Sequence, residues 1–263
     1  RLQDGKVASE ITLEGMQPVA LTVDAAGGIW VADDRKKRVV KLDENGAELL
    51  SVGSSGSGPG QFSHPSALAV ASSGLLFVAD SGNRSVQVFR SDGVFLRELG
   101  GDKVKIERPV ALGLDPEDRL FVLDAERGSV SVFSAGGEFM HEFGRQKEGS
   151  IFSRPRDMVV TPDEVLVLDG NQVKTFDHRG RLLRAFGAKA TGTVMLRDPV
   201  SLAMSGGSTL FLADVATKRV AVLSVLYKPQ APQEIMAKNG VHAIDLQWAQ
   251  PTARYISAFR VYR

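Results

Sequence analysis

Residues 65–95 read PSALAVASSGLLFVADSGNRSVQVFRSDGVF, and this stretch decides the fold. Apolar residues alternate in short runs, and Gly, Pro, Asp and Asn bound each run. Alternation with a period of two over runs of this length predicts β-strands, and no helical period competes with it. We expect four strands, near residues 65–70, 76–80, 85–89 and 94–99.

The same order of features recurs five times along the chain. Each unit opens at a proline, and the opening prolines are 44 to 47 residues apart: Pro18, Pro65, Pro109, Pro155 and Pro199. The second predicted strand of each unit ends in an aspartate: Asp33, Asp80, Asp124, Asp169 and Asp214. One four-stranded sheet cannot bury both of its faces alone, whereas radial stacking of several sheets does so. The repeat therefore predicts an all-β fold, a β-propeller of four-stranded blades.

The unit at residues 65–95 resembles the NHL repeat, and the resemblance extends over residues 4–225 or so. It implies a propeller, but it implies little about function because propellers carry many unrelated activities. The fourth unit shortens the turn after the aspartate to Gly170-Asn171-Gln172, and the fifth replaces it with residues 215–219.

Closure of the propeller depends on the two ends of the repeat. The fifth unit lacks a fourth strand, while residues 4–13 match the turn and fourth strand of a unit without its first three. We expect this N-terminal strand to complete the last of five blades. Since related NHL propellers usually have six blades, a missing upstream repeat is the alternative.

The pattern changes after residue 228. A Pro-rich hinge at residues 229–232 predicts a linker between a propeller at 1–228 and a segment at 229–263. The strands around Trp248 and Tyr262 resemble the opening of a fibronectin type III domain. That resemblance implies a modular, exported parent of which this chain is a piece; an irregular sixth blade is the alternative.

Composition sets further bounds on function. The formal net charge is +1, so no global excess of charge directs the chain to nucleic acid or membrane, and no apolar run approaches the roughly 18 residues of a membrane helix. Cysteine is absent, which excludes disulfides and thiol catalysis but does not fix the compartment.

Catalytic groups are sparse. The four histidines, His64, His141, His178 and His242, fall at different blade positions, so we do not expect them to converge on one metal. A ring of the five strand-ending aspartates is compatible with a Ca²⁺ site, but a residue needed once per blade is better explained as a structural acceptor for N–H groups of the next turn. We therefore expect no catalytic residues, no metal and no cofactor.

Charge is expected to separate between the two ends of the blades. Loops joining second to third strands share a face with loops joining successive blades, and counting gives about +6 there and about −6 on the opposite face. Arg84 and Arg127 are expected to pair with the strand-ending aspartates, while Arg108, Arg154 and Arg197 precede opening prolines and are expected to form an arc. The candidate binding residues are Arg35, Lys36, Arg38, Arg84, Arg108, Arg127, Arg154, Arg156, Arg197 and Arg219.

These observations favour a non-catalytic binding module, extracytoplasmic and bacterial, that engages an acidic protein or an anionic glycan. One alternative is an enzyme of the propeller lyase or lactonase type with a metal in the central channel. A third is RNA binding, which needs exposed aromatic side chains beside the basic loops. Phe62 and Phe152 are the only loop aromatics expected near the basic arc.

Overall fold

The computed structural model describes residues 2–3, 6–7, 10–101, 104–146, 149–187, 196–205, 209–227, 235–239, 244–248 and 254–262. At residues 2–3, 6–7, 146, 224–227 and in the last three ranges it describes the backbone alone. The chain consists of two compact units, Arg1–Ala185 and Phe186–Arg263, and each is described by itself.

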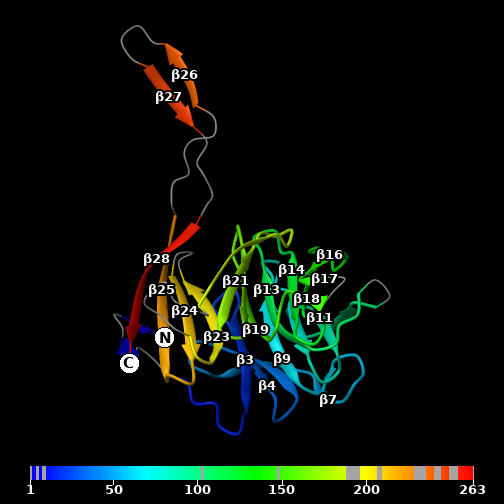
Figure 1. Ribbon diagram of the computed structural model, residues 1–263. Coiled ribbons are helices and arrows are strands. Elements are labelled where there is room, and N and C mark those ends of the chain that lie inside the picture. Colours follow the sequence, from blue (N-terminus) through cyan, green and yellow to red (C-terminus); the bar gives the residue numbers. More distant parts are fainter. Residues whose placement is uncertain are drawn as a thin grey trace. The chain divides into compact units, whose positions relative to one another are not determined.

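Four antiparallel sheets of four strands make up blades 1 to 4 (Figure 1). Within each sheet the strands follow chain order. Blade 1 contains β3 (Pro18–Val23), β4 (Ile29–Asp33), β5 (Arg38–Leu42) and β6 (Glu48–Val52). Blade 2 contains β9 (Pro65–Val70), β10 (Leu76–Asp80), β11 (Ser85–Phe89) and β12 (Phe95–Leu99). Blade 3 contains β13 (Pro109–Leu114), β14 (Leu120–Asp124), β15 (Ser129–Phe133) and β16 (Phe139–Phe143). Blade 4 contains β19 (Pro155–Val160), β20 (Val165–Asp169), β21 (Gln172–Phe176) and β22 (Leu182–Phe186).

A fifth four-stranded sheet belongs to the second unit. It contains β23 (Pro199–Ser205), β24 (Thr209–Asp214), β25 (Arg219–Tyr227) and β28 (Arg254–Tyr262). The prediction of an all-β propeller with five four-stranded blades is confirmed. The described residues contain no helix, and none of them forms a helical membrane span.

Short strand pairs complete the secondary structure. They are β1 (Leu2–Gln3) with β2 (Lys6–Val7), β7 (Ser54–Ser55) with β8 (Gln61–Phe62), β17 (Arg145–Gln146) with β18 (Gly149–Ser150), and β26 (Ile235–Asn239) with β27 (Ile244–Trp248). Two of these pairs, β7–β8 and β17–β18, lie in segments that connect successive blades.

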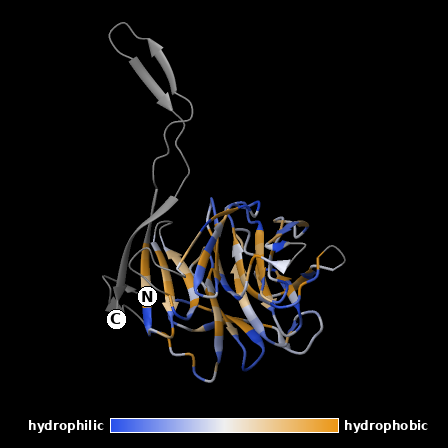
Figure 2. Cartoon of the chain, in the orientation of Figure 1, coloured by the Kyte–Doolittle hydropathy of each residue, from blue (hydrophilic) through white to orange (hydrophobic). Residues whose placement is uncertain are grey.

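The core of the first unit lies between neighbouring blades. The first strands β3, β9, β13 and β19 lie next to one another in turn, so each sheet packs a face against the next. Between blades 1 and 2, for example, Trp30 and Phe89 are each 1% exposed within one apolar cluster. Figure 2 shows hydrophobic residues along the blade strands and hydrophilic residues at the loops. Full burial of one such large apolar side chain contributes about 1.5–3 kcal/mol, which explains why alternating strands specify this stacking.

The prediction that residues 4–13 supply the last fourth strand is wrong. β1 and β2 pair with each other, and residues 10–13 form no strand. Leu13 and Met16 instead pack on the apolar cluster of Val31, Val40 and Leu42 in blade 1. Burial of this apolar face of blade 1 accounts for the course of the N-terminal segment.

The C-terminal segment supplies the missing strand. β28 pairs antiparallel with β25 along its length, from Val220 opposite Tyr262 to Tyr227 opposite Arg254. β26 and β27 pair only with each other, so the described part of the tail forms no sixth four-stranded blade. The division at residues 228 and 229 and the fibronectin type III-like segment stay predictions.

Candidate binding face

A buried aspartate organises the loops at one end of every blade. In blade 3, Asp124 is 2% exposed and accepts hydrogen bonds from the backbone N–H groups of Glu126 (3.0 Å) and Arg127 (2.9 Å) in the following turn. The same carboxylate accepts from the N–H groups of Glu107 (2.6 Å) and Arg108 (3.1 Å), which lie just before the blade's opening proline. One side chain thus ties two loops together.

A bond from the aspartate to the segment before the opening proline occurs in all five blades, and the predicted role of these aspartates as acceptors for turn N–H groups is confirmed in four of them, Asp33, Asp80, Asp124 and Asp214. The bonds back to the segment before the opening proline were not foreseen, because they span 15 to 17 residues of sequence. They come from Gln17 to Asp33, Ser63 and His64 to Asp80, Glu107 and Arg108 to Asp124, Ser153 and Arg154 to Asp169, and Arg197 and Asp198 to Asp214.

In three blades these hydrogen bonds lower the pKa of the aspartate, at Asp33, Asp169 and Asp214. Burial by itself raises the pKa of Asp33, but the N–H groups of Gln17, Lys36 and Arg35 outweigh it and hold the pKa below its ordinary value. At Asp169 the pKa is also lowered against burial, here by the Lys174 ammonium together with backbone N–H groups. Burial also raises the pKa of Asp214, but the N–H groups of Arg197 and Thr217 stabilise the anion and hold the pKa below its ordinary value.

The aspartates also fix the backbone that carries the predicted arginines. The N–H of Arg108 binds Asp124, and its carbonyl oxygen accepts from Ala125 at 2.9 Å. Arg154 is held in the same two ways by Asp169 and Gly170. Both side chains are exposed and leave the fold from equivalent points.

Arg197 does not extend this series as expected. Asp198 occupies the position equivalent to Arg108, because its carbonyl oxygen accepts from Val215, the residue after the blade aspartate. Arg197 is exposed and stands one residue earlier, at the position of Glu107. The predicted arc of three arginines therefore contains two equivalent members in the first unit and a displaced one in the second.

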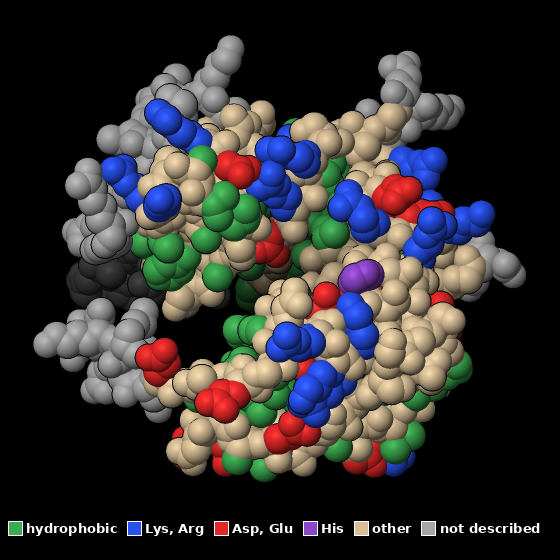
Figure 3. Space-filling view, turned by 90° about the horizontal axis from the view of Figure 1, so that it is seen from below, with side chains coloured by type: hydrophobic (Ala, Val, Ile, Leu, Met, Phe, Trp, Pro, Cys, Tyr) green, Lys and Arg blue, Asp and Glu red, His purple; other side chains and the backbone are tan. Residues whose placement is uncertain are grey.

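We use the term basic loop face for one end of blades 1 to 4. It consists of the turns between second and third strands together with the segments that lead into each blade, which antiparallel order places at the same end. Over its described residues, 10–17, 34–37, 53–64, 81–84, 100–101, 104–108, 125–128, 144–146, 149–154 and 170–171, nine Lys and Arg face five Asp and Glu. Figure 3 shows Lys and Arg side chains spread over the loops on this side, with acidic side chains between them.

The turns at the opposite end of blades 1 to 4 have the reverse composition. There eleven Asp and Glu stand against four Lys and Arg, over residues 24–28, 43–47, 71–75, 90–94, 115–119, 134–138, 161–164 and 177–181. The charges separate because basic and acidic residues lie in loops at opposite ends of the blades. This separation creates a local electric field although the formal net charge of the chain is only +1.

Several basic residues on the predicted list are already paired. The expected pairs of Arg84 and Arg127 with the strand-ending aspartates are wrong: Arg84 lies 3.4 Å from Glu107, and Arg127 lies 2.9 Å from Glu142. The carboxylates of Asp80 and Asp124 are occupied by backbone N–H groups instead. Arg38 lies 3.0 Å from Glu48.

Other basic residues point to solvent. Among the described residues, no ion pair involves the exposed side chains of Arg35, Lys36, Lys105, Arg108 and Arg145. Arg156 is half-buried on β19, and Arg219 is exposed at the start of β25 in the second unit. Lys105 and Arg145 are not among the binding residues predicted from the sequence, because the local sequence does not show which basic side chains lack an ion-pair partner.

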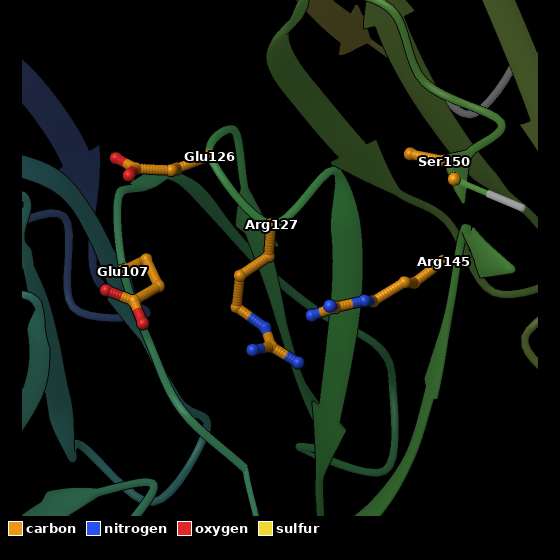
Figure 4. A pocket seen from close by; sticks show the side chains of 6 residues that line it. Glu107, Glu126, Arg127, Arg145 and Ser150 are labelled. Carbon is orange, nitrogen blue, oxygen red and sulfur yellow. The ribbon is translucent and has the colours of Figure 1, made fainter. Parts of the chain in front are cut away.

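One pocket opens on the basic loop face. Its volume is about 490 Å³, and it is lined by Glu107, Glu126, Arg127, Arg145, Gly149 and Ser150. Figure 4 shows the head groups of Arg127 and Arg145 pointing toward one another, with the two glutamates on the other side of Arg127. The pocket thus has a basic and an acidic wall.

The two loop aromatics are not available for stacking. Phe62 is fully buried and Phe152 is 6% exposed. Each ring packs against a glycine that directly follows the fourth strand of a blade, Gly53 for Phe62 and Gly144 for Phe152. A Cβ at Gly53 would come within 2.3 Å of the Phe62 ring, and one at Gly144 within 2.3 Å of the Phe152 ring. Trp30, Phe77 and Phe121 are core residues. Neither Phe62 nor Phe152 can therefore stack on a nucleic-acid base.

The histidines lie in two places. His64 is exposed on the basic loop face, with its Nδ1 3.1 Å from Asp34. His141 and His178 come together unexpectedly, because His141 Nε2 lies 3.0 Å from the carbonyl oxygen of His178. His178 Nε2 in turn donates to the carbonyl oxygen of Thr161 at 2.8 Å. No group of three potential metal ligands occurs in the described part of the chain, and His242 lies outside it.

Fold and loops together define a propeller of four-stranded blades whose buried aspartates hold a charged loop face. Comparison with known sequences agrees: residues 62–89 match the NHL repeat model. Over 78 residues the chain is 35% identical to NHL repeat-containing protein 3 of Homo sapiens and of Mus musculus. The match covers 28% of this chain and 22% of each relative, so the chain spans about a fifth of the curated relatives it matches.

Solved structures show the same fold. Virginiamycin B lyase from Staphylococcus aureus, solved as a catalytically inactive variant with quinupristin, superposes with a TM-score of 0.63 at 15% identity, covering 92% of this chain and 74% of that one. A streptogramin B lyase gives a TM-score of 0.64 at 12% identity, with 95% and 75% covered. A nidogen/laminin complex gives 0.62 at 15%, with 80% and 76% covered. At these identities the likeness concerns the fold alone.

Proposed function

We propose that this chain is a non-catalytic binding module that holds an acidic protein segment or an anionic polymer on its basic loop face. The observation that carries the proposal is the separation of charge among the described loop residues: nine Lys and Arg against five acids at one end of blades 1 to 4, and four against eleven at the other. Such a field attracts an anionic partner to one face and repels it from the other.

The loops that bear the charge are held firmly. Backbone N–H groups of Arg35, Lys36 and Arg108 bind buried aspartates, so these residues project from a fixed backbone. A preorganised surface loses less conformational entropy on binding than a mobile one. Their exposed side chains are therefore suited to meet a partner's carboxylates, sulfates or phosphates.

Binding of two probes tests the proposal: fluorescein-labelled poly-L-glutamate and heparin, titrated with the full chain at two salt concentrations. The variant Arg35→Glu/Lys36→Glu/Arg108→Glu should bind both at least about tenfold more weakly, a loss of about 1.4 kcal/mol. The matched control Arg90→Glu/Arg179→Glu/Arg181→Glu makes the same charge change on the opposite face and should bind like the parent. Equal losses in the two variants, or no binding by the parent, would overturn the proposal.

An enzyme of the propeller lyase or lactonase type is the second candidate. The observation that favours it is the fold shared with virginiamycin B lyase and streptogramin B lyase. Elemental analysis of the purified chain after mild dialysis tests it: about one tightly held Zn²⁺ or Ca²⁺ per chain would favour a metal-dependent reaction.

We also propose an extracytoplasmic, modular bacterial parent. Support comes from the Pro-rich residues 229–232 and from the fibronectin type III-like residues at 243–248. Protease treatment of intact cells expressing the tagged parent protein tests the location, because a surface protein is cleaved and a cytoplasmic one is protected.

A further inference from the structure

The pocket on the basic loop face contains charges of both signs. It lies entirely within the first unit and has a volume of about 490 Å³, enough for a few side chains. Three loops contribute to it: Glu107 precedes blade 3, Glu126 and Arg127 belong to the turn after β14, and Arg145 belongs to β17.

The basic wall combines Arg127, which has an ion-pair partner, with Arg145, which has none among the described residues. Glu142 accepts from Arg127 Nη2 at 2.9 Å and from its Nε at 3.2 Å, and the Ser129 hydroxyl donates to the same carboxylate at 2.6 Å. Arg127 is therefore held in place and its charge is balanced. Arg145 is exposed, and no ion pair involves it among the described residues.

Arg145 nevertheless stands on an ordered backbone. It pairs with Ser150 in the β17–β18 ladder, and the Ser150 hydroxyl donates to the carbonyl oxygen of Gly128. In Figure 4 its guanidinium points toward that of Arg127. A carboxylate placed between them would receive two charge-assisted interactions.

The acidic wall likewise combines one glutamate that has an ion-pair partner with one that has none among the described residues. Glu107 lies 3.4 Å from Arg84, whereas Glu126 is exposed and has no ion pair among the described side chains. The N–H groups of both glutamates bind Asp124, at 2.6 and 3.0 Å, and the N–H of Arg127 in the basic wall binds the same buried carboxylate at 2.9 Å.

We infer that this pocket binds a mixed-charge peptide segment, with an acidic side chain on Arg145 beside Arg127 and a basic side chain on Glu126 beside Glu107. A segment of this kind supplies both missing counter-charges. A uniform polyanion such as heparin or a nucleic-acid strand would satisfy Arg145 but bring a second negative group against Glu126, which is unfavourable. The inference rests on the proposed function and narrows its partner to a protein.

Fluorescence anisotropy with two kinds of labelled dodecapeptide tests this. The reference peptide contains only Glu and Gly, and in the series a single Lys replaces each Gly in turn. If the inference holds, at least one Lys-containing peptide binds the parent chain roughly fivefold more tightly than the reference, or about 1 kcal/mol, although its net negative charge is smaller. A field acting on net charge alone predicts the opposite order.

Two variants locate the effect. Glu126→Gln should abolish the advantage of the Lys-containing peptide without weakening the reference, whereas Arg145→Gln should weaken both. The matched controls Glu138→Gln and Arg179→Gln, exposed on the opposite face, should change neither.

The outcomes separate the two proposals. Should no Lys-containing peptide exceed the reference, or should its advantage survive Glu126→Gln, the pocket inference is wrong while charge-dependent binding by the face still stands. Should the parent bind neither peptide nor heparin, both are wrong.

Discussion

Replacement of Asp124 by Asn should be costly even though the two side chains have the same shape. One carboxylate oxygen accepts from Glu126 and Arg127, and the other accepts from Glu107 at 2.6 Å. An Asn side chain keeps one acceptor and turns an NH₂ group toward the remaining backbone N–H groups. Donor then faces donor in a site that is 2% exposed.

The magnitude follows from the number of donors left without an acceptor. A buried N–H without a partner costs about 1–3 kcal/mol. Asp124→Asn strands at least one backbone donor and its own NH₂, so we expect a loss of about 2–4 kcal/mol. Asp124→Ala strands all four backbone donors but lets water enter the space, and we expect about 3–5 kcal/mol.

Urea unfolding followed by circular dichroism measures these losses as shifts of the midpoint. The matched control is Asp92→Asn, an exposed carboxylate beside Arg90, which should change stability by less than about 0.5 kcal/mol. If Asp124→Asn were as mild as Asp92→Asn, Asp124 would not be the side chain that ties the two loops together.

Three further predictions concern the blades themselves. Gly144→Ala should destabilise the chain by about 2–4 kcal/mol, because it combines a φ of 95° with a Cβ only 2.3 Å from the Phe152 ring. Gly27→Ala, with a φ of 85° and no atom near the added Cβ, should cost only about 1 kcal/mol in the same urea assay. Burial opposes ionisation of Asp24, but Lys41, the Gly28 N–H and the Trp30 indole lower its pKa to about 2. Because the unfolded pKa is about 3.9, this stabilisation is present above pH 4 and disappears as the pH falls toward 2, so Asp24→Asn should lose more stability at pH 6 than at pH 2.5. Deletion of residues 254–263 should lower the melting temperature and promote aggregation, seen by light scattering, since β25 then becomes an open edge.

The sequence alone was sufficient for blades 1 to 4 and for the first three strands of the fifth. Strand alternation is a local property, and five opening prolines and five aspartates at spacings of 44 to 47 residues mark the same boundaries that the structure shows. The turn bonds of the aspartates were also predictable, because donor and acceptor lie two or three residues apart. The excess of basic residues in the loops at one end of the blades, and of acidic residues at the other end, follows from the order of the strands alone.

Only the tertiary structure decided which charges remain available. Arg127 turns to Glu142 and Arg84 to Glu107 because backbone N–H groups from a loop 15 to 17 residues away already occupy the aspartates. Phe152 is buried because Gly144 allows its ring to approach the backbone. The outer strand of the last sheet likewise comes from residues 254–262 rather than from the N-terminus. Each of these outcomes is a competition between distant groups for one partner, and such a competition leaves no mark in the local pattern of residues.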